Sequence, residues 1–364
     1  MKIGIRVDSS DLIGLGHVVR CIHLAKKLQQ GGHIVFFISQ RLTGSVPNLI
    51  VENGFQVYFI NSGKKDSIIL PINGFKSEFD PWLNGRQSID ALETEKIIKK
   101  CPLDLLIVDH YSIDAEWEKY LKGIVKSIIV IDDLANRKHC CELLIDQNYV
   151  HEYQKRYQPF VNSSCKTLLG PKYVIIGDEY LQYKNFDTEK SRVGNQLLIY
   201  FGGSDKFNFC DKAIQASLAS QIPDLKIHVV VNSGRSSTAT ICEKYKKNSR
   251  IIIHEDLPTL AHLLKDVVCA IGAGGTTTYE RCFMKVWSIV ITIADNQIPV
   301  AKHMSENGYI EWLGHQSSVD INSITKCLVD RFEKLKNEPN SMLVGQKLID
   351  GSGTSRIVNE IIHL

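Results

Sequence analysis

The sequence lacks any hydrophobic run long enough to cross a membrane. Hydrophobic residues make up 44% of its 364 residues, but no apolar stretch approaches the roughly 20 residues that a transmembrane helix needs. The first residues also lack the basic and apolar regions of a signal peptide, because a predicted strand begins at once and the acidic Asp8 follows it. We therefore expect a cytoplasmic protein with no segment inserted in a membrane.

An excess of one charge is also missing. The chain has 43 Lys and Arg residues against 40 Asp and Glu residues, so its formal net charge is only +3. It contains no run of basic residues with interleaved aromatics, the pattern that follows a nucleic acid backbone. The sequence thus predicts no nucleic acid partner, and it leaves the oligomeric state open.

Cysteine pairs with the spacing of a metal site are absent. None of the ten cysteines forms a Cys-x-x-Cys pair, and most stand in apolar runs, where a free thiol packs as a small hydrophobic side chain. Cys140 and Cys141 follow His139, but adjacent side chains splay apart and no second pair of ligands follows. We expect reduced cysteines, no metal site and no bound cofactor.

The sequence does contain a glycine-rich turn between a strand and a helix, close to its start. Residues 2–7 predict a short strand, and apolar residues recur at helical spacing from Val18 onward. Gly14 and Gly16 allow a sharp turn and a close approach of a ligand, while the free N–H groups of the first helical turn favour an anion. His17 stands at the start of this helix, where a bound ligand would lie.

Polar clusters follow the strands predicted at residues 103–109, 127–132 and 143–146. Ligands bind beyond the carboxyl ends of the strands in an open parallel sheet, so we expect these clusters to share one edge with His17. Their members are Asp109, His110, Tyr111, Asp132, Asp133, Gln147 and Asn148. Residues 61–85 show no clear periodicity and predict a long irregular loop or lid.

The alternation of strands and helices restarts after a polar, charged stretch at residues 183–195. We interpret this stretch as a linker that could act as a hinge. The predicted fold is α/β and GT-B-like, with two doubly wound Rossmann-type domains that face each other across a cleft. The expected domains are residues 1–186 and 187–364.

Glycine motifs mark the second half as well. A predicted strand that ends at Phe201 precedes Gly202-Gly203-Ser204-Asp205, and another that ends at Ile271 precedes a glycine-rich turn. That turn, residues 272–281, leads into a helix and predicts a phosphate site, because backbone N–H groups at such a junction attract anions.

Taken together, these motifs resemble one family. The set, in chain order, is Gly14-x-Gly16-His17, Ile131 to Arg137, Asp146 to Asn148, Leu168 to Tyr173, Phe201 to Asp205, Gly272 to Cys282 and Ala294 to Gln297. In this set the chain resembles the UDP-sugar hydrolases of pseudaminic acid biosynthesis, the PseG family, which are related to MurG-type GT-B glycosyltransferases. The resemblance spans most of the chain.

The resemblance implies an enzyme that releases UDP from UDP-2,4-diacetamido-2,4,6-trideoxy-β-L-altropyranose. Water would attack the anomeric carbon, with inversion and without a metal. An imidazole has an ordinary pKa of about 6.5, so it is largely neutral at cytoplasmic pH and suits a general base, a role worth roughly 10² to 10⁴ in rate. His17 is the expected base, and the helix start at residues 274–278 would hold the leaving diphosphate.

The resemblance also selects the expected site. The catalytic residue is His17, and the substrate-binding residues are Asp8, Gly14, Gly16, Gly203, Ser204, Gly274, Gly275, Thr276, Thr277, Glu280, Asn296 and Gln297. Glu280 is expected on the ribose hydroxyls, as in GT-B enzymes.

Structural roles remain open for several of these residues. His17 could simply cap its helix, and Asp8 either orients His17 or the sugar or only satisfies loop amides. Asp109, His110, Tyr111, Asp132 and Asp133 either contact the N-acetyl groups or cap the helices that follow. At the level of the whole chain, the alternatives are a GT-B glycosyltransferase, a hydrolase of a related nucleotide-sugar and a non-catalytic binding module.

Overall fold

The computed structural model describes residues 1–10, 12–45, 47–60, 82–83, 86–185, 194–203, 205–233, 236–337 and 348–364. Most of the expected irregular segment 61–85, part of the expected linker and Ser204 lie outside these residues.

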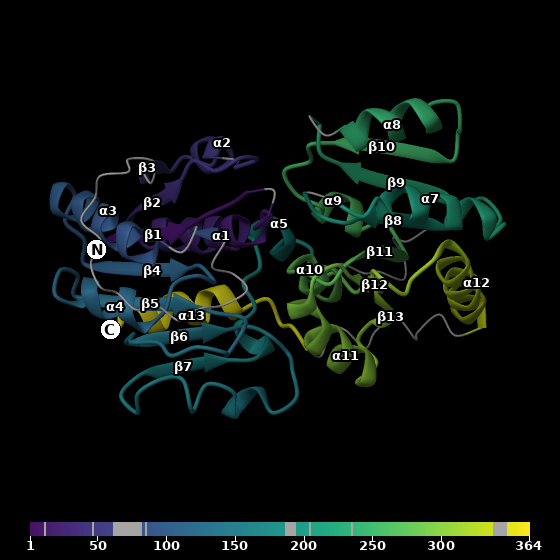
Figure 1. Ribbon diagram of the computed structural model, residues 1–364. Coiled ribbons are helices and arrows are strands. Elements are labelled where there is room, and N and C mark those ends of the chain that lie inside the picture. The colour runs from purple at the N-terminus through teal and green to yellow at the C-terminus, as the bar shows by residue number, and fades with distance from the viewer. Residues whose placement is uncertain are drawn as a thin grey trace. The chain divides into compact units, whose positions relative to one another are not determined.

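The chain forms two compact units (Figure 1). Unit 1 consists of Met1–Asn148, Glu152–Ile175 and Ser352–Leu364, and unit 2 consists of Tyr149–His151 and Ile176–Gly351. This division lies ahead of the boundary expected between residues 186 and 187, and the carboxyl-terminal segment returns to unit 1.

Unit 1 is built on a parallel sheet with the strand order β3-β2-β1-β4-β5-β6-β7. Its strands are β1 (Lys2–Val7), β2 (Ile34–Gln40), β3 (Gln56–Ile60), β4 (Leu105–Asp109), β5 (Ser127–Ile131), β6 (Leu143–Asp146) and β7 (Lys166–Leu169). Its main helices are α1 (Gly16–Gln30), α2 (Pro47–Glu52), α3 (Gln87–Lys100), α4 (Ala115–Lys122) and α13 (Gly353–Ile362).

Both faces of this sheet are covered, so its central strands β4, β5 and β6 are buried and mostly apolar rather than alternating. In β4, Leu105 and Ile107 join the core formed with α1, α2 and α13, whereas Leu106 and Val108 join the core formed with α3 and α4. The doubly wound arrangement predicted from the short apolar runs is therefore confirmed for unit 1.

Unit 2 has a second parallel sheet, with the order β10-β9-β8-β11-β12-β13. Its strands are β8 (Gln196–Tyr200), β9 (Lys226–Val231), β10 (Ile251–Glu255), β11 (Cys269–Ala273), β12 (Trp287–Thr292) and β13 (Glu311–His315). Its main helices are α5 (Asp178–Leu181), α7 (Phe209–Ala219), α8 (Ser236–Tyr245), α9 (Ala261–Leu264), α10 (Thr277–Phe283), α11 (Ile298–Glu306) and α12 (Ile321–Asn337).

Helix α13, which the sequence placed in the second half, packs in unit 1 beside α1 (Figure 1). Ile357 and Ile361 are almost fully buried in the core that contains Ile3 and Ile5 of β1. Periodicity identifies the apolar face of a helix but not the sheet that covers it, which is why the sequence could not place α13.

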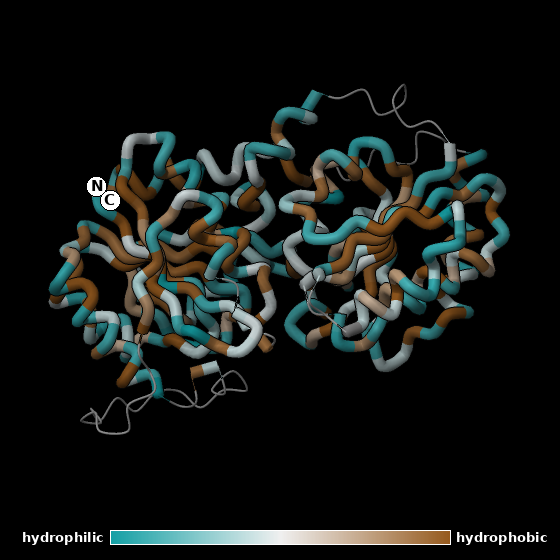
Figure 2. Tube along the Cα trace, turned by 90° about the horizontal axis from the view of Figure 1, so that it is seen from above, coloured by the Kyte–Doolittle hydropathy of each residue, from teal (hydrophilic) through white to brown (hydrophobic). Residues whose placement is uncertain are grey.

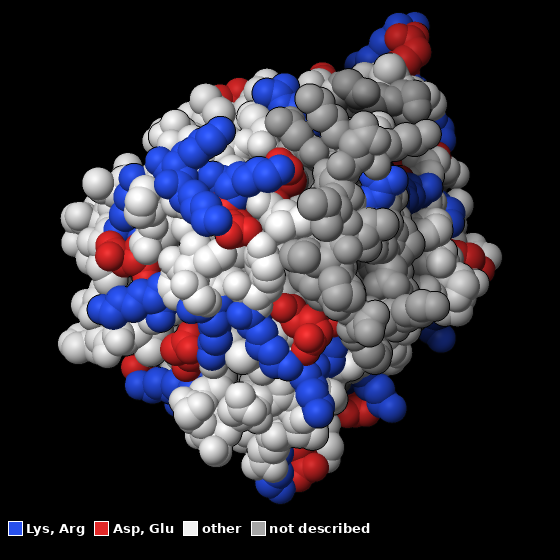
Figure 3. All heavy atoms as spheres, turned by 60° about the vertical axis from the view of Figure 1, so that its left-hand side comes forward, with Lys and Arg blue, Asp and Glu red and all other residues white. Residues whose placement is uncertain are grey.

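Hydrophobic residues gather on the strands of each unit, with hydrophilic residues around them (Figure 2). On the face shown in Figure 3, Lys and Arg side chains lie next to Asp and Glu side chains without a large region of one sign. No helix of the described residues is both long enough and apolar enough to cross a membrane.

Candidate active site

The turn between β1 and α1 is closed by its own backbone. The N–H of Gly14 donates to the carbonyl of Ser10 at 2.8 Å, and the Ser10 hydroxyl accepts from the N–H of Ile13 at 3.0 Å. Gly14 has a φ of +81°, in the left-handed region that glycine adopts without steric cost. The helix begins at Gly16, so His17 lies in its first turn, where its side chain is largely buried.

His17 is hydrogen-bonded to Asp109, a buried carboxylate at the end of β4. The Nδ1 of His17 lies 2.6 Å from Oδ1 of Asp109. Arg20, one turn further along α1, donates to both oxygens of the same carboxylate, at 2.6 Å from Nε and 2.6 Å from Nη2. The sequence suggested Asp8 as the residue that orients His17, and in the structure Asp109 takes this place.

The charge of Asp109 decides which nitrogen of His17 carries the hydrogen. Burial acts to raise the pKa of Asp109, but Arg20 and then His17 outweigh it and hold that pKa well below its usual range. An ionised carboxylate can only accept a hydrogen bond, so Nδ1 of His17 is the donor. Nε2 is then the basic nitrogen of the neutral ring, as in a general base that a carboxylate orients.

Asp133, which follows β5, connects two of the side chains around His17. Its carboxylate accepts from Nη1 of Arg20 at 2.7 Å and from the hydroxyl of Tyr111 at 2.6 Å. Tyr111 packs edge-on against the His17 ring with centroids 4.5 Å apart, and it stacks on Trp82 at 4.9 Å. Three polar residues predicted for this sheet edge therefore form one cluster with His17.

Asp8 belongs to a different buried network at the end of β1. Its carboxylate pairs with Arg6 through contacts of 2.6 and 2.8 Å, and it accepts from the N–H of Gln40 at 2.7 Å. The Nε2 of His110 approaches it at 3.2 Å, and Arg6 also pairs with Asp90. These contacts fit the interpretation that Asp8 satisfies groups of the fold, and a contact with substrate stays a prediction.

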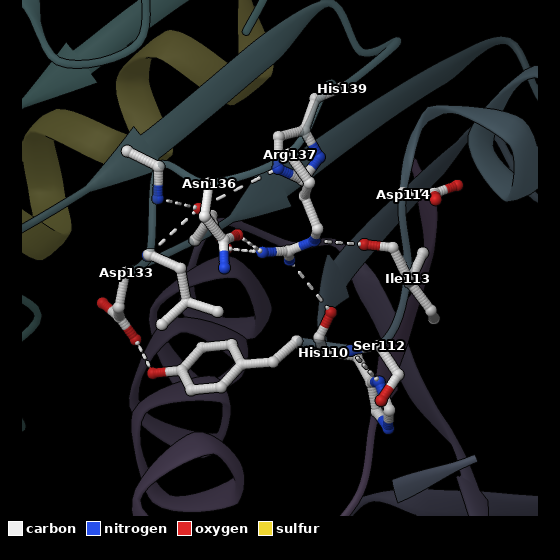
Figure 4. A network of polar contacts seen from close by, with 12 residues as sticks. His110, Ser112, Ile113, Asp114, Asp133, Asn136, Arg137 and His139 are labelled. Atoms are coloured by element: carbon white, nitrogen blue, oxygen red, sulfur yellow. Dashed lines mark hydrogen bonds and ion pairs between the residues drawn. The ribbon is translucent and has the colours of Figure 1, made fainter. Parts of the chain in front are cut away.

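The segments after β4 and β5 are tied together by Arg137 (Figure 4). Arg137 donates to the carbonyl of Ile113 at 2.7 Å and pairs with the carboxylate of Asp132 at 2.7 Å. Asp132 also accepts from two N–H groups of the following loop, at 3.1 and 2.9 Å. His110 accepts at Nδ1 from the N–H of Ser112, and burial lowers its pKa. Asp132 and His110 thus have structural partners, and their contact with a sugar stays a prediction.

The polar residues after β6 extend the same edge. The side-chain amide of Asn148 donates to Asp133 and to Asp146, at 2.8 Å in each case. Burial raises the pKa of Asp146 to about 7, although Arg156 lies 2.6 Å away and opposes this effect. Gln147 accepts instead from a backbone N–H of the segment after β7, at 3.0 Å.

The second glycine-rich turn joins β11 to α10 in unit 2. Gly272 lies in β11, where a Cβ would come within 2.3 Å of Nη1 of Arg281 and 2.4 Å of the Tyr200 carbonyl. Gly275 has open space around it. Residues 274–277, which include Thr276 and Thr277, are partly exposed, whereas α10 beyond them is buried. The expected phosphate site thus coincides with the accessible part of this turn.

Glu280, expected on the ribose, is buried within α10. Its carboxylate accepts a hydrogen bond of 2.8 Å from the hydroxyl of Tyr180, a residue of α5. Burial raises the pKa of Glu280 to about 7. The carboxyl group therefore keeps its proton to a higher pH than an exposed glutamate does, and its contact with ribose stays a prediction.

The remaining expected contacts lie in loops of unit 2. The carbonyl of Gly203 accepts from a side-chain amide of the loop after β9 at 3.4 Å, and the nearby Asp205 caps α7. The side chain of Gln297 accepts from a backbone N–H four residues earlier at 2.9 Å. Asn296 is half-buried in a short 3-10 helix. Ser204 lies outside the described residues.

Arg20 is a side chain beside His17 that the sequence analysis did not name, and the partner of Arg6 was also not foreseen. Arg20 stands three residues after His17 and so shares a face of the helix with it, and this spacing is a usable signal. Arg6 and Asp90 are 84 residues apart, and no local pattern links them.

Within the described part of the chain, no group of three or more His, Cys, Asp and Glu side chains is placed to hold a metal ion. All ten cysteines are free thiols, and Cys141 and Cys165 come closest, with their sulfurs 3.7 Å apart.

Known proteins resemble this chain in sequence and in structure. No protein-family model matches it. It is 27% identical, over 85% of its length and 98% of the relative, to the UDP-2,4-diacetamido-2,4,6-trideoxy-β-L-altropyranose hydrolase of Campylobacter jejuni. It is 26% identical, over 80% of its length, to an uncharacterised protein of Methanocaldococcus jannaschii, of which it spans only 55%.

Among solved structures, MurG of Acinetobacter baumannii superposes on the whole chain with a TM-score of 0.65 and 14% identity, over 99% of its own length. At this identity the likeness shows the fold alone. The chain thus has the fold of MurG and is similar in sequence to the UDP-2,4-diacetamido-2,4,6-trideoxy-β-L-altropyranose hydrolase, which agrees with the resemblance named from the motifs.

Proposed function

We propose that this chain hydrolyses UDP-2,4-diacetamido-2,4,6-trideoxy-β-L-altropyranose to UDP and the free sugar, without a metal. The observation that carries the proposal is the 2.6 Å contact between Nδ1 of His17 and Asp109. It leaves Nε2 as a base at the sheet edge where ligands of parallel sheets bind. The relative from Campylobacter jejuni, which carries the name of this hydrolase, supports the choice of substrate.

The proposed step is a single displacement with inversion. Nε2 of His17 takes a proton from water as the water oxygen bonds to the anomeric carbon. The bond from that carbon to the diphosphate oxygen breaks, and its electron pair leaves with UDP. Asp109 stabilises the imidazolium that forms, because its carboxylate already accepts from Nδ1.

We assign the nucleotide to unit 2. The backbone N–H groups of the partly exposed residues 274–277 would bind the diphosphate, and Glu280 would accept from the ribose hydroxyls. Gly203, Ser204, Asn296 and Gln297 remain the proposed further contacts in this unit. Gly14, Gly16 and Asp8 are the proposed contacts of the sugar in unit 1.

Hydrolysis in heavy-oxygen water tests the proposal directly. The UDP-diacetamido sugar is incubated with the protein and a chelator, without an acceptor, and the products are analysed by mass spectrometry. Label in the free sugar and none in UDP is the expected result. Label in UDP would mean attack at phosphorus, and rapid NMR of the first-formed anomer reports inversion or retention.

Transfer of the sugar to an acceptor is the second candidate, because the MurG likeness places the chain among folds that include glycosyltransferases. It predicts that UDP release depends on an added acceptor. A chain that only binds a nucleotide-sugar would release no UDP under either condition, and a hydrolase of a related nucleotide-sugar would respond to a different donor.

A further inference from the structure

Asp133 occupies a central place in the cluster around His17, although it does not touch the imidazole. Its carboxylate contacts Arg20 at 2.7 Å, Tyr111 at 2.6 Å and Asn148 at 2.8 Å. Arg20 and Tyr111 are themselves neighbours of His17: Nη2 of Arg20 lies 3.2 Å from Nδ1, and the Tyr111 ring packs on the imidazole. A single carboxylate thus holds two of the groups that surround the imidazole.

The charges show why a second carboxylate matters. Arg20 makes two contacts of 2.6 Å with Asp109, so on its own it would cancel much of the negative charge that stabilises a protonated His17. Asp133 shares the charge of the guanidinium through Nη1. With one arginine between two carboxylates, the cluster keeps a net negative charge that an imidazolium would balance.

The groups that face His17 come from four parts of unit 1. Arg20 is on the same helix, Asp109 ends β4 and Tyr111 follows it, and Asp133 follows β5 and acts through the others. Trp82 packs edge-on against the imidazole with ring centroids 5.6 Å apart. Cys21 adds a thiol near Asp109, with its sulfur 3.4 Å from Oδ2, and burial raises the pKa of this thiol so that it stays neutral. The charge of Asp133 can therefore be removed without replacing a residue that contacts the imidazole directly.

We propose that Asp133 is a positioning residue for His17, which shares the charge of the Arg20 guanidinium beside the imidazole and keeps the imidazole ring in place by holding Tyr111. The inference rests on the proposed role of His17 as the base. It adds a residue that acts from a distance, through two arms that can be tested separately: a charged arm through Arg20 and an aromatic arm through Tyr111.

Asp133→Asn tests the charged arm, because asparagine has the same shape and still accepts hydrogen bonds. In protein with ¹⁵N-labelled histidines, the His17 ring signals are assigned by their loss in His17→Gln and followed against pH. The midpoint of their titration should move to lower pH by roughly 0.5 to 1 unit in Asp133→Asn, since a negative charge is lost. The acid limb of kcat/KM should move with it, while kcat falls roughly tenfold and KM changes little.

Asp104→Asn is the matched control. Asp104 immediately precedes β4, at the opposite end from Asp109, and accepts from the N–H of Lys2 at 2.7 Å. The same loss of charge there should leave the His17 midpoint in place. An unmoved midpoint in Asp133→Asn, or an equal shift in Asp104→Asn, would overturn the proposed charged arm.

Tyr111→Phe tests the aromatic arm and keeps every charge. It should leave the midpoint unchanged but broaden the ring signals of His17, because the phenyl ring is no longer fixed by Asp133. Ring signals as sharp as in the unmodified protein would refute this arm. Because the NMR measurement needs no substrate, absence of hydrolysis would count against the proposed function while the titration still decides the role of Asp133.

Discussion

At the scale of single residues, the proposed chemistry depends on a pair that is 92 residues apart in the sequence, His17 and Asp109. Asp109 is held ionised by Arg20, and its place at the end of β4 puts it beside the first turn of α1. Neither residue alone indicates more than a polar group at a sheet edge. Their contact is what gives the imidazole a defined basic nitrogen.

Replacing His17 should separate catalysis from binding. In His17→Asn we expect kcat to fall by roughly 10² to 10⁴, the usual contribution of a general base, with UDP binding retained because the nucleotide is assigned to unit 2. UDP release and calorimetric titration with UDP measure the two effects. His33→Asn is the control, since His33 is a surface histidine beside the amino terminus. Full activity in His17→Asn would show that His17 is not the general base.

Replacing Asp109 by asparagine should let the ring of His17 adopt the wrong tautomer. An amide can donate to Nδ1, which would place the hydrogen on Nε2 and remove the base. We expect kcat to fall at least 10²-fold, and the ¹⁵N spectrum of the ring to change from the Nδ1–H form to the Nε2–H form. A retained Nδ1–H signal would contradict this explanation, whatever the rate.

The raised pKa of Glu280 predicts that the affinity for the nucleotide depends on pH. Its pKa is raised from 4.5 to about 7, so the folded chain carries a proton there that the unfolded chain loses near pH 4.5. Its contribution to stability is therefore complete below pH 4.5 and is lost as the pH rises towards 7. Ribose hydroxyls bind best to the ionised form, so the affinity for UDP should rise between about pH 6 and 8.

The comparison with Glu280→Gln isolates this group. The variant should bind UDP more weakly at pH 8 and lose most of the dependence on pH, because glutamine has no proton to release. Tyr180→Phe removes the hydroxyl that donates to Glu280 and keeps the carboxyl group, so it should retain the dependence. A parallel rise of affinity with pH in Glu280→Gln would assign the effect to another group.

At the scale of elements, the turn between β11 and α10 offers two glycines with opposite surroundings. Gly272→Ala would place a Cβ 2.4 Å from the Tyr200 carbonyl, a backbone atom that cannot move without displacing β8. We expect a loss of roughly 2 to 4 kcal/mol in the free energy of unfolding, measured with denaturant.

Gly275→Ala is the matched comparison, because nothing lies within 4 Å of a Cβ at Gly275. Its free energy of unfolding should stay within about 0.5 kcal/mol of the original. If the diphosphate approaches this backbone closely, the same substitution should weaken UDP binding about tenfold. Equal stability of the two alanine variants would show that the packing around Gly272 is looser than described.

The elements also show how far a sequence can be interpreted. The runs predicted at residues 103–109, 127–132 and 143–146 overlap β4, β5 and β6, because buried parallel strands are continuous apolar segments. Strand β7 was missed because two of its four residues are exposed and polar, and β13 because Gly314 and its polar ends leave only Trp312 and Leu313 as an apolar run. The contact of Glu280 with Tyr180 and the pairing of Arg6 with Asp90 were beyond prediction too, because these partners are 100 and 84 residues apart in the sequence.

At the scale of the whole molecule, the carboxyl-terminal segment belongs to unit 1 although it follows unit 2 in the sequence. Helix α13 follows the whole of unit 2 in sequence but contributes Ile357 and Ile361 to the core of unit 1, where they are 0% and 1% exposed. A Cβ at Gly353, the first residue of α13, would lie 2.2 Å from the carbonyl of Val174, so the start of the helix is also fitted closely to unit 1.

Removal of α13 should therefore destabilise unit 1, most of which is distant from α13 in the sequence. Each buried isoleucine contributes roughly 1.5 to 3 kcal/mol, so a chain ending at Gly351 should lose a large part of the stability of unit 1. Hydrogen exchange should then speed up in β1 and β4 but remain slow in β8 and β11. A chain that lacks only the exposed His363 and Leu364 is the control, and faster exchange confined to unit 2 would mean that α13 stabilises the unit it follows in sequence.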